Sequence, residues 1–341
     1  MTTLTIRNAR QDEAALLTDI AKRSKAYWGY DEKFMAKCQE ELTVKSKNIG
    51  KDDSAHVVAE KENKVIGFYA LQNIDGKEFE LGALYVAAEH IKTGVGYELM
   101  AHAKNRAAAL GGRTIIIQSD PNAIGFYTAS GAIHVGTRKS LRTDRDLPLL
   151  RITLITPSSA LLLIDVQKGF DSPCWGKRNN LSAEDNIAKL LSIWRKRGYP
   201  IIHIQHCSTN PDSPLASGQS GNEFKKEAQP LADEKQFPKT VNSAFIGTAL
   251  EDHLQKNNIF SLVIVGLTTD HCVSTTTRMA ANLGFNVILV SDATATFERM
   301  GHDGNEYSAD EIHKTGLASL NGEFCVIRST DEVLNDFKKA C

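Results

Sequence analysis

The chain has 341 residues, of which 42% are hydrophobic and 24% are charged, and its formal net charge is −1. This composition is typical of an ordinary globular protein, and the length suits two domains better than one. The near-neutral charge argues against nucleic acid or an anionic membrane as a partner. No apolar run is long enough to span a bilayer, and the first residues lack the basic and apolar regions of a signal peptide.

The six cysteines are scattered, and none forms a CxxC pair. Such spacing fits free thiols in a reducing compartment better than a disulfide framework. We therefore expect a cytoplasmic protein that acts on small molecules. The cysteines are Cys38, Cys174, Cys207, Cys272, Cys325 and Cys341.

The first part of the chain, residues 1–155, predicts a mixed α+β domain. Two strand-like runs flank Glu60–Asn63, which is a hairpin signal. A strongly helical run begins at Gly96 and is stopped by Gly111 and Gly112. The predicted strands are 4–9, 56–59, 64–71, 79–86, 113–118, 135–140 and 149–155, and the predicted helices are 12–26, 96–110 and 122–129.

Within this domain, residues 84–97 read as a strand, a loop and the start of a helix. The loop carries Gly94 and Gly96, one residue apart. Glycines let backbone N–H groups approach a phosphate, and the dipole at a helix N-terminus favours its negative charge. A lone G-x-G pair is weak evidence, because helix-entry turns that bind nothing are common.

The loop and the later segment Gln118–Ala132 together resemble the two core motifs of the GNAT acetyltransferases, over residues 4–155. Residues 25–35 also look like the substrate-side segment of that family. The resemblance implies an acetyl-CoA site in which a strand pairs with the pantetheine arm and loop amides hold the pyrophosphate. The implied cofactor-binding residues are Leu84, Tyr85, Val86, Lys92, Thr93, Gly94, Val95, Gly96, Tyr97 and Asn122.

The same resemblance implies roles for two titratable side chains. Tyr127 would protonate the departing thiolate, and Glu80 is a candidate base for the amine nucleophile. An exposed strand glutamate without a catalytic role is an equally good interpretation of Glu80. One position departs from the family, because Ile91 stands where arginine or glutamine is usual, and the adjacent Lys92 is the expected substitute.

A short polar linker, Thr156–Ser159, separates this domain from the second one, residues 158–341. Here strands and helices alternate, which predicts a doubly wound, mainly parallel α/β sheet. Ligands of such sheets bind outside the carboxyl ends of the strands. The predicted strands are 161–166, 201–206, 262–266, 287–291 and 324–327, and the predicted helices are 186–197, 248–257, 274–283 and 308–320.

Cys272 follows the apolar run 262–266 and precedes a helix, so its sulfur is expected near a helix N-terminus, which stabilises a thiolate. Asp165 ends another buried-strand run and would reach the same edge, whereas Lys239 follows a proline and would arrive from a loop. An ammonium lowers the pKa of a thiol, and a carboxylate can take up its proton. Taken one at a time, Cys272 suggests a small buried hydrophobic residue, Asp165 a helix cap and Lys239 a surface lysine. Taken together, the three residues favour a catalytic site.

This set resembles the isochorismatase-like cysteine hydrolases, over residues 158–337. The resemblance implies a triad of Asp165, Lys239 and Cys272, a cis peptide at Leu267–Thr268, and an oxyanion hole formed by the amides of Thr268 and Cys272. The motifs that carry it are Leu163–Gln167, Lys239 with Ser243–Phe245, Gly266–Val273 and Val290–Ala293. Asp292, within the last motif, is better interpreted as a cap or turn residue.

Some relatives are nicotinamidases, which hold a metal through an aspartate-x-histidine motif. The corresponding region, His203–Asn210, lacks that motif, and strand alternation puts His203 and His206 on opposite faces. We therefore expect no catalytic metal. True isochorismatases generally lack the nucleophilic cysteine, so Cys272 favours hydrolysis of an amide or a related C–N bond.

The sequence thus predicts a bifunctional enzyme, an acetyl-CoA-dependent N-acetyltransferase joined to a metal-independent cysteine amidohydrolase. An amine- and amide-bearing compound such as an antibiotic would suit both sites, and such hydrolases often form homo-oligomers. Two alternatives stay open: a sensor domain that only binds CoA, and a redox protein in which Cys272 senses peroxide. Aromatic pocket walls are expected from Trp28, Tyr30, Phe170 and Trp175.

Overall fold

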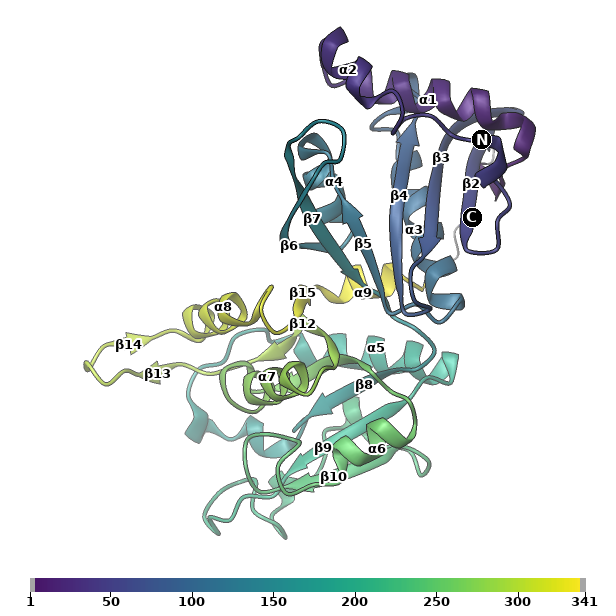
Figure 1. The fold of residues 1–341 in the computed structure, drawn as a ribbon. Helices are drawn as coiled ribbons and strands as arrows, with labels where there is room; N and C mark the ends of the chain where they lie inside the picture. Colours follow the sequence, from purple (N-terminus) through teal and green to yellow (C-terminus); the bar gives the residue numbers. More distant parts are fainter. Residues whose placement is uncertain (1–3, 338–341) are drawn as a thin grey trace. The chain divides into compact units, whose positions relative to one another are not determined.

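The computed structural model describes residues 4–337, which form two compact units divided between Leu154 and Ile155 (Figure 1). The predicted linker lies at this division, and its Thr156 N–H donates to the Ser159 hydroxyl at 2.8 Å. Residues 1–3 and 338–341 of the predicted domains, Cys341 among them, lie outside the described residues. Between residues 4 and 337, none of the helices has both the length and the apolar character that crossing a bilayer requires.

The first unit is a seven-stranded sheet in the order β1-β2-β3-β4-β5-β7-β6. All neighbouring strands are antiparallel except β4 and β5, which are parallel. The strands are β1 (Thr5–Asn8), β2 (Ser54–Lys61), β3 (Lys64–Asn73), β4 (Glu78–Val86), β5 (Thr114–Gln118), β6 (Ala132–Lys139) and β7 (Asp146–Thr153). The helices are α1 (Ala14–Ala26), α2 (Glu32–Cys38), α3 (Val95–Ala109) and α4 (Ile124–Ala129).

Helices cover both faces of this sheet. Buried side chains of α1 pack with Val58 and Phe68 on one face, and those of α3 pack with Val57 and Tyr69 on the other. Strands β4 and β5 pair only where Glu78–Glu80 face Thr114–Ile116, and they diverge beyond that point (Figure 1). The sheet is therefore open along the second half of β4.

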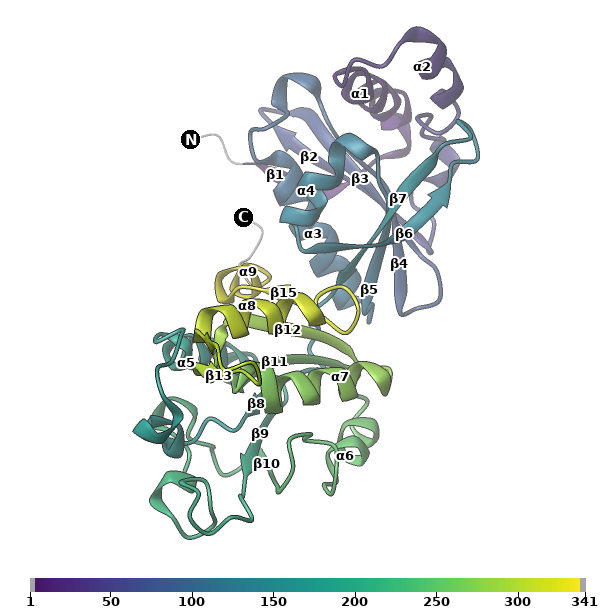
Figure 2. The same cartoon turned by 90° about the vertical axis from the view of Figure 1, so that its left-hand side faces the viewer.

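The second unit is a six-stranded parallel sheet in the order β10-β9-β8-β11-β12-β15, and Figure 2 shows these strands following one another. The sheet strands are β8 (Ser159–Ile164), β9 (Ile201–His206), β10 (Lys235–Lys239), β11 (Ser261–Leu267), β12 (Asn286–Ala295) and β15 (Val326–Arg328), and β13 (Arg299–Met300) and β14 (Glu306–Tyr307) form a separate hairpin. The helices are α5 (Ala183–Arg197), α6 (Leu250–Lys256), α7 (Ser274–Asn282), α8 (Ala309–Leu320) and α9 (Thr330–Asn335).

Alternate residues of the central strands enter different cores. On β8, Leu161 and Leu163 pack with residues of α5 and α9, whereas Leu162 and Ile164 pack with residues of α6, α7 and α8. Both faces are thus buried, which explains why these strands are continuous apolar runs in the sequence. The predicted doubly wound α/β fold is confirmed.

One difference changes how the site is built. Lys239 was expected on a loop, but it is the last residue of β10, which pairs with β9 at the edge of the sheet. The strand escaped prediction because it contains two lysines and Pro238 and has no apolar run. Both residue types are typical of edge strands, where one side needs no ladder hydrogen bonds.

Candidate active sites

Three side chains meet at the carboxyl edge of the parallel sheet. Asp165 directly follows β8, Lys239 ends β10, and Cys272 follows β11. The Lys239 Nζ donates to Asp165 Oδ2 at 2.7 Å and to Cys272 Sγ at 3.3 Å. Neither the Asp165 nor the Lys239 side chain is exposed, and Cys272 is 7% exposed. The structure therefore brings together the three residues on which the hydrolase prediction depends, and their catalytic roles stay a prediction.

The backbone around Cys272 also has the expected form. The Leu267–Thr268 peptide bond is cis, and a π-helical turn, Thr269–Val273, leads into α7. The Thr269 hydroxyl lies 2.9 Å from His313 Nδ1, which ties this turn to α8. Cys272 is thus held in the turn just before a helix N-terminus. The oxyanion hole of the Thr268 and Cys272 amides stays a prediction.

The protonation of this site differs from the expectation. Burial raises the pKa of the Cys272 thiol to about 12, and the Asp165 charge adds to this effect while Lys239 opposes it. Burial also raises the pKa of Asp165, against the lowering effect of Lys239. Lys239 acts on the thiol in the expected direction, but burial outweighs it, so the pKa of Cys272 is raised rather than lowered. The thiol keeps its proton, and a carboxylate with a raised pKa is a better acceptor for it.

Two neighbours of the triad were missed. His206 Nδ1 lies 3.1 Å from Lys239 Nζ, and Cys272 Sγ donates to Asn242 Oδ1 at 3.6 Å. His203 and His206 lie on opposite faces of the sheet, as expected. The His203 side chain is buried, and its Nε2 lies 2.8 Å from Glu234 Oε2 rather than near the triad. The sequence did contain a signal for His206, because it ends β9 at the same edge of the sheet where Lys239 ends β10 and Asp165 follows β8.

By residue type, this cluster could be taken for a metal site. Asp165, His206 and Cys272 place one ligand atom each within 4.8 Å of one another. However, the Lys239 ammonium hydrogen-bonds Asp165 and Cys272 and lies within 3.1 Å of His206. A divalent cation there would be repelled by this charge at close range. The residues present therefore do not fit a resident metal.

A separate cavity of about 450 Å³ lies in the N-terminal unit, where β4 and β5 diverge. Most of the residues predicted to hold acetyl-CoA line it, as does Tyr127. Thr93 and Val95 do not: the Thr93 N–H and hydroxyl both donate to the His90 carbonyl, at 3.4 and 2.7 Å, and Val95 is buried. The predicted residues on the lining are Leu84, Tyr85, Val86, Lys92, Gly94, Gly96, Tyr97, Asn122 and Tyr127.

The start of α3 lines this cavity with Gly94, Gly96 and Tyr97. Gly94 has a φ of 94°, a left-handed conformation that glycine adopts without strain, and α3 begins at the next residue. The first amides of a helix have no partner within the helix, and its dipole favours negative charge. The Tyr97 N–H already donates to the Gly94 carbonyl at 3.0 Å. Fewer loop amides are therefore free for an anion than expected, and the binding of the pyrophosphate of acetyl-CoA at Gly94–Gly96 stays a prediction.

A polar cluster that the sequence did not reveal contributes Lys25, Asp120 and Asn122 to the lining of this cavity. The Lys25 Nζ donates to Asp120 Oδ2 at 3.2 Å, the Tyr30 hydroxyl donates to Asp120 Oδ1 at 2.8 Å, and Asn122 Nδ2 donates to the Tyr30 oxygen at 3.0 Å. Although burial acts the other way, hydrogen bonds from the Asn122 N–H, Tyr30 and Lys25 hold the pKa of Asp120 below its usual value. These contacts join the end of α1 to the end of β5.

The two predicted acid–base residues of this domain lie differently. Tyr127 is 7% exposed and lines the cavity, and burial raises its pKa, so its hydroxyl keeps a proton that it can donate. The structure does not bring Glu80 to the cavity lining. Its carboxylate instead accepts a hydrogen bond from Arg138 at 2.7 Å, which favours the interpretation of Glu80 as a strand residue without a catalytic role.

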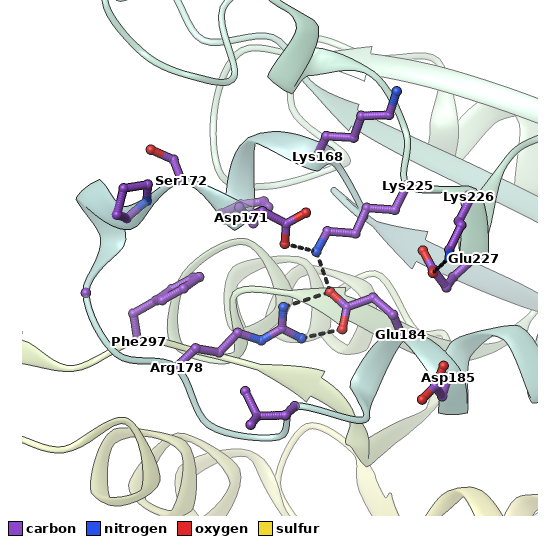
Figure 3. Close-up of a pocket in the computed structure, with 14 residues that line it drawn as sticks. Lys168, Asp171, Ser172, Arg178, Glu184, Asp185, Lys225, Lys226, Glu227 and Phe297 are labelled. Carbon is purple, nitrogen blue, oxygen red and sulfur yellow. Dashed lines mark hydrogen bonds and ion pairs between the residues drawn. The ribbon is translucent and has the colours of Figure 1, made fainter.

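A further cavity, of about 740 Å³, lies in the second unit and is drawn in Figure 3. Its central charges are paired: Arg178 donates to Glu184 at 2.7 Å, and Lys225 bonds both Glu184, at 2.8 Å, and Asp171. The triad is absent from the described residues that line it. Of the four aromatic residues expected in pocket walls, Phe170 lines this cavity and Trp28 lines the N-terminal one, whereas Tyr30 and Trp175 are not among the described residues that line either. We interpret these ion pairs as anchors between α5 and the neighbouring loops.

The remaining structural expectation in this unit concerned Asp292. Its Oδ1 accepts hydrogen bonds from the Thr330 N–H at 2.7 Å and the Thr330 hydroxyl at 2.8 Å. Asp292 lies within β12 rather than after it, and its carboxylate binds the first residue of α9, whose N-cap is Ser329. The structure thus gives Asp292 a structural contact at the start of that helix, but not the turn position expected after residue 290. The cysteines at positions 38, 174, 207, 272 and 325 are all free thiols, as predicted.

Comparison with known proteins assigns both units. The Isochorismatase domain model matches residues 159–332, and the Acetyltransferase (GNAT) family model matches residues 17–132. An uncharacterized isochorismatase family protein of Bacillus subtilis, YrdC, is 49% identical over 53% of this chain and 96% of its own length. A streptothricin hydrolase of Streptomyces noursei is 31% identical over 42% of this chain and 57% of its own length.

Among solved structures, an isochorismatase-family hydrolase from Chromobacterium violaceum is 44% identical, with a TM-score of 0.52, and the match covers 53% of this chain and 94% of that one. The predicted fusion is confirmed. The chain belongs to the isochorismatase family, and it carries a GNAT acetyltransferase domain ahead of its isochorismatase domain.

Proposed function

We propose that the protein is a bifunctional enzyme that hydrolyses a C–N bond through a covalent thioester and acetylates an amine with acetyl-CoA. The observation that carries the hydrolase half is the Lys239 ammonium, which is hydrogen-bonded to Asp165 and Cys272 at once. A buried acid, a cation and a thiol in mutual contact are what thiol-based nucleophilic catalysis requires.

In the hydrolase reaction, the thiol proton passes to Asp165 as the sulfur attacks the amide carbonyl carbon. A C–S bond forms, and the charge that develops on the carbonyl oxygen is stabilised by the Thr268 and Cys272 amides. The C–N bond then breaks, and the leaving nitrogen takes the proton from Asp165. Water then attacks the thioester carbon and gives a proton to Asp165. The C–S bond breaks, the carboxylic acid product leaves, and Asp165 returns the proton to the sulfur, which restores the thiol and the Asp165 carboxylate.

In the acetyltransferase reaction, acetyl-CoA supplies the acetyl group. The amides at the start of α3 and the Lys92 side chain would hold its pyrophosphate, and the open edge of β4 would pair with its pantetheine arm. Tyr127, buried and protonated, would donate a proton to the departing sulfur. With Glu80 held by Arg138, the amine would be bound in its neutral form or deprotonated through water.

For the substrate class, we propose a basic, amine- and amide-bearing antibiotic. Similarity to a streptothricin hydrolase supports an antibiotic on the hydrolase side. On the acetyltransferase side, Glu41 and the partly exposed Trp28 line the cavity, and within residues 4–337 no ion pair involves Glu41. A carboxylate and an indole ring that line the same cavity suit a cationic acceptor. Streptothricin is the first compound to test.

The two alternatives are less well supported by the geometry. A peroxide-sensing thiol is typically exposed and of low pKa, whereas Cys272 is buried with a raised pKa. A domain that only binds CoA needs no acceptor site, yet the cavity extends past the expected cofactor residues to Lys25, Trp28 and Glu41.

The test separates the two activities by substitution. Cys272→Ala should abolish hydrolysis and leave acetylation unchanged, because the two sites lie in different units. Tyr127→Phe should slow acetylation by about 10²-fold, the usual worth of a general acid, and leave hydrolysis unchanged. Mass spectrometry of streptothricin with and without acetyl-CoA would follow the gain of water and of an acetyl group. Normal hydrolysis by Cys272→Ala would refute the thioester mechanism.

A further inference from the structure

His206 is a neighbour of the triad to which no role has been assigned so far. It ends β9 next to Lys239, which ends β10, and the two residues are register partners in the parallel pair. Its Nδ1 lies 3.1 Å from the Lys239 Nζ. The same ammonium contacts Asp165 at 2.7 Å and Cys272 at 3.3 Å, so it has three neighbours of acceptor type.

A lysine ammonium carries three N–H donors and no acceptor. Three acceptors around Lys239 therefore use every donor, and the ammonium cannot rotate away from the sulfur without breaking a bond in a buried site. His206 can accept from an ammonium only if its Nδ1 is unprotonated. Burial, with a smaller contribution from Lys239, lowers the pKa of His206 to about 4, so the ring is neutral near pH 7.

The backbone of His206 is itself fixed. Its N–H donates to Gln167 Oε1 at 2.8 Å, and its carbonyl accepts from Gln167 Nε2 at 3.0 Å and from Asn222 Nδ2 at 2.8 Å. Gln167 is fully buried and lies two residues after Asp165. The end of β9 is thus clamped to the segment that carries the acid, which sets the ring at a constant place relative to the triad.

We propose that His206 is a positioning residue of the hydrolase site, which holds the Lys239 ammonium between Asp165 and Cys272 by accepting its third N–H at Nδ1. The proposal rests on the proposed thiol-based hydrolysis, but it can be tested without a substrate. It assigns the ring one tautomer, with the proton on Nε2.

The first test uses three substitutions of the same residue. His206→Asn can place an amide oxygen where Nδ1 lies, whereas the longer His206→Gln places it near the Nε2 position, and His206→Leu has no acceptor. Iodoacetamide at pH 8 serves as the probe, and the rate at Cys272 is read by peptide mass spectrometry. We expect the Leu and Gln variants to react about tenfold more slowly, because the ammonium loses the hydrogen bond that holds it against the sulfur.

His206→Asn should retain the wild-type rate within about threefold, since its amide oxygen restores a single acceptor of similar strength. Equal rates in all four proteins, or an Asn variant no faster than the Gln variant, would overturn the proposal. Far-UV circular dichroism shows whether each variant is folded. Lys239→Met is the reference for complete loss of the ammonium, and it should be at least as slow as His206→Leu.

The second measurement concerns the wild-type ring. Long-range ¹H–¹⁵N spectra, assigned by comparison with His206→Asn, should show an unprotonated Nδ1 and a protonated Nε2 at pH 7. A proton on Nδ1 would overturn the proposal. Should streptothricin and other amides prove inert while both measurements agree with expectation, the substrate proposal fails and the role of His206 stands.

Discussion

At the scale of single residues, the hydrolase site is controlled by a competition between burial and charge at Cys272. The Lys239 ammonium 3.3 Å away favours the thiolate, but burial and the nearby Asp165 carboxylate favour the thiol more strongly. The Cys272 thiol therefore keeps its proton beside the carboxylate that we propose as its base. A reactive anion would form only when an electrophile reaches the sulfur, which protects the thiol from oxidation.

Asp165→Asn tests this arrangement through the pH dependence of Cys272 alkylation. A thiol with a raised pKa is protonated below that pKa, so without an internal base it reacts only through the fraction ionised by solvent. The variant rate should then rise about tenfold per pH unit between roughly pH 6 and 8. The wild-type rate should rise less steeply, because Asp165 accepts the proton within the site. Parallel profiles would count against Asp165 as the base.

At the scale of secondary structure, the site depends on how closely β8 and β11 approach each other. Gly266 on β11 has a φ of 120° and pairs with Ile164, the residue before Asp165. A Cβ at position 266 would lie 2.0 Å from the Ile164 carbonyl oxygen, which is backbone and cannot move aside. Glycine is thus required where the strand that leads to Cys272 meets the strand that carries Asp165.

Gly266→Ala should therefore destabilise the second unit by about 3 kcal/mol or more and abolish hydrolysis, since β8 and β11 must separate. Gly284→Ala is the matched control: its φ is also positive, at 86°, but a Cβ there meets no atom within 4 Å. Gly284→Ala should lower the free energy of unfolding by only about 1–2 kcal/mol, which is the cost of a residue with a Cβ in the left-handed conformation. Urea unfolding of both variants measures the difference, and equal losses would contradict the role given to the close approach.

The same scale shows what the sequence could predict. Apolar strands such as β8 and β11 were located within two residues, because burial on both faces imposes an unbroken hydrophobic run. Strand β10 was missed because an edge strand needs neither that run nor every backbone donor. Its last residue, Lys239, was still identified as a site residue, through family resemblance rather than through any pattern that predicts the strand.

At the scale of the whole molecule, each unit has cores of its own. The N-terminal sheet is covered by two hydrophobic clusters, and the parallel sheet by two others. A unit with its own core can in principle fold alone. The cavity that we propose for acetyl-CoA and the triad belong to different units, so a ligand of one site is expected to stabilise that unit alone.

Differential scanning calorimetry should accordingly resolve two unfolding transitions. Acetyl-CoA at about 100 times its Kd adds ~2.7 kcal/mol to the unit that binds it, which corresponds to roughly 5–10 °C for a domain of this size. Only one transition should move, and Gly266→Ala should lower only the other. A single unfolding transition that moves both with acetyl-CoA and with Gly266→Ala would contradict the independent unfolding of the two units.

The limits of sequence analysis were different for the two sites. Fold and triad followed from motifs, since motif residues lie at strand ends and glycine turns, where local geometry restricts the choice. The Lys25–Tyr30–Asp120 cluster was not foreseen, because it joins residues about 90 positions apart whose partners no local pattern specifies. The raised pKa of Cys272 was not foreseen either, because it depends on the depth of burial, which a sequence does not report.

The contacts around Lys239 have a consequence for how the hydrolase meets its substrate. A proton that moves among Asp165, Lys239 and Cys272 leaves their summed charge at zero, whichever group carries it. Because His206 beside them is neutral, these four side chains carry no net charge that could attract or repel a charged compound. The contribution of these side chains to substrate binding should therefore change little with ionic strength. Selectivity for a cationic antibiotic would have to come from charged residues farther from the reaction centre.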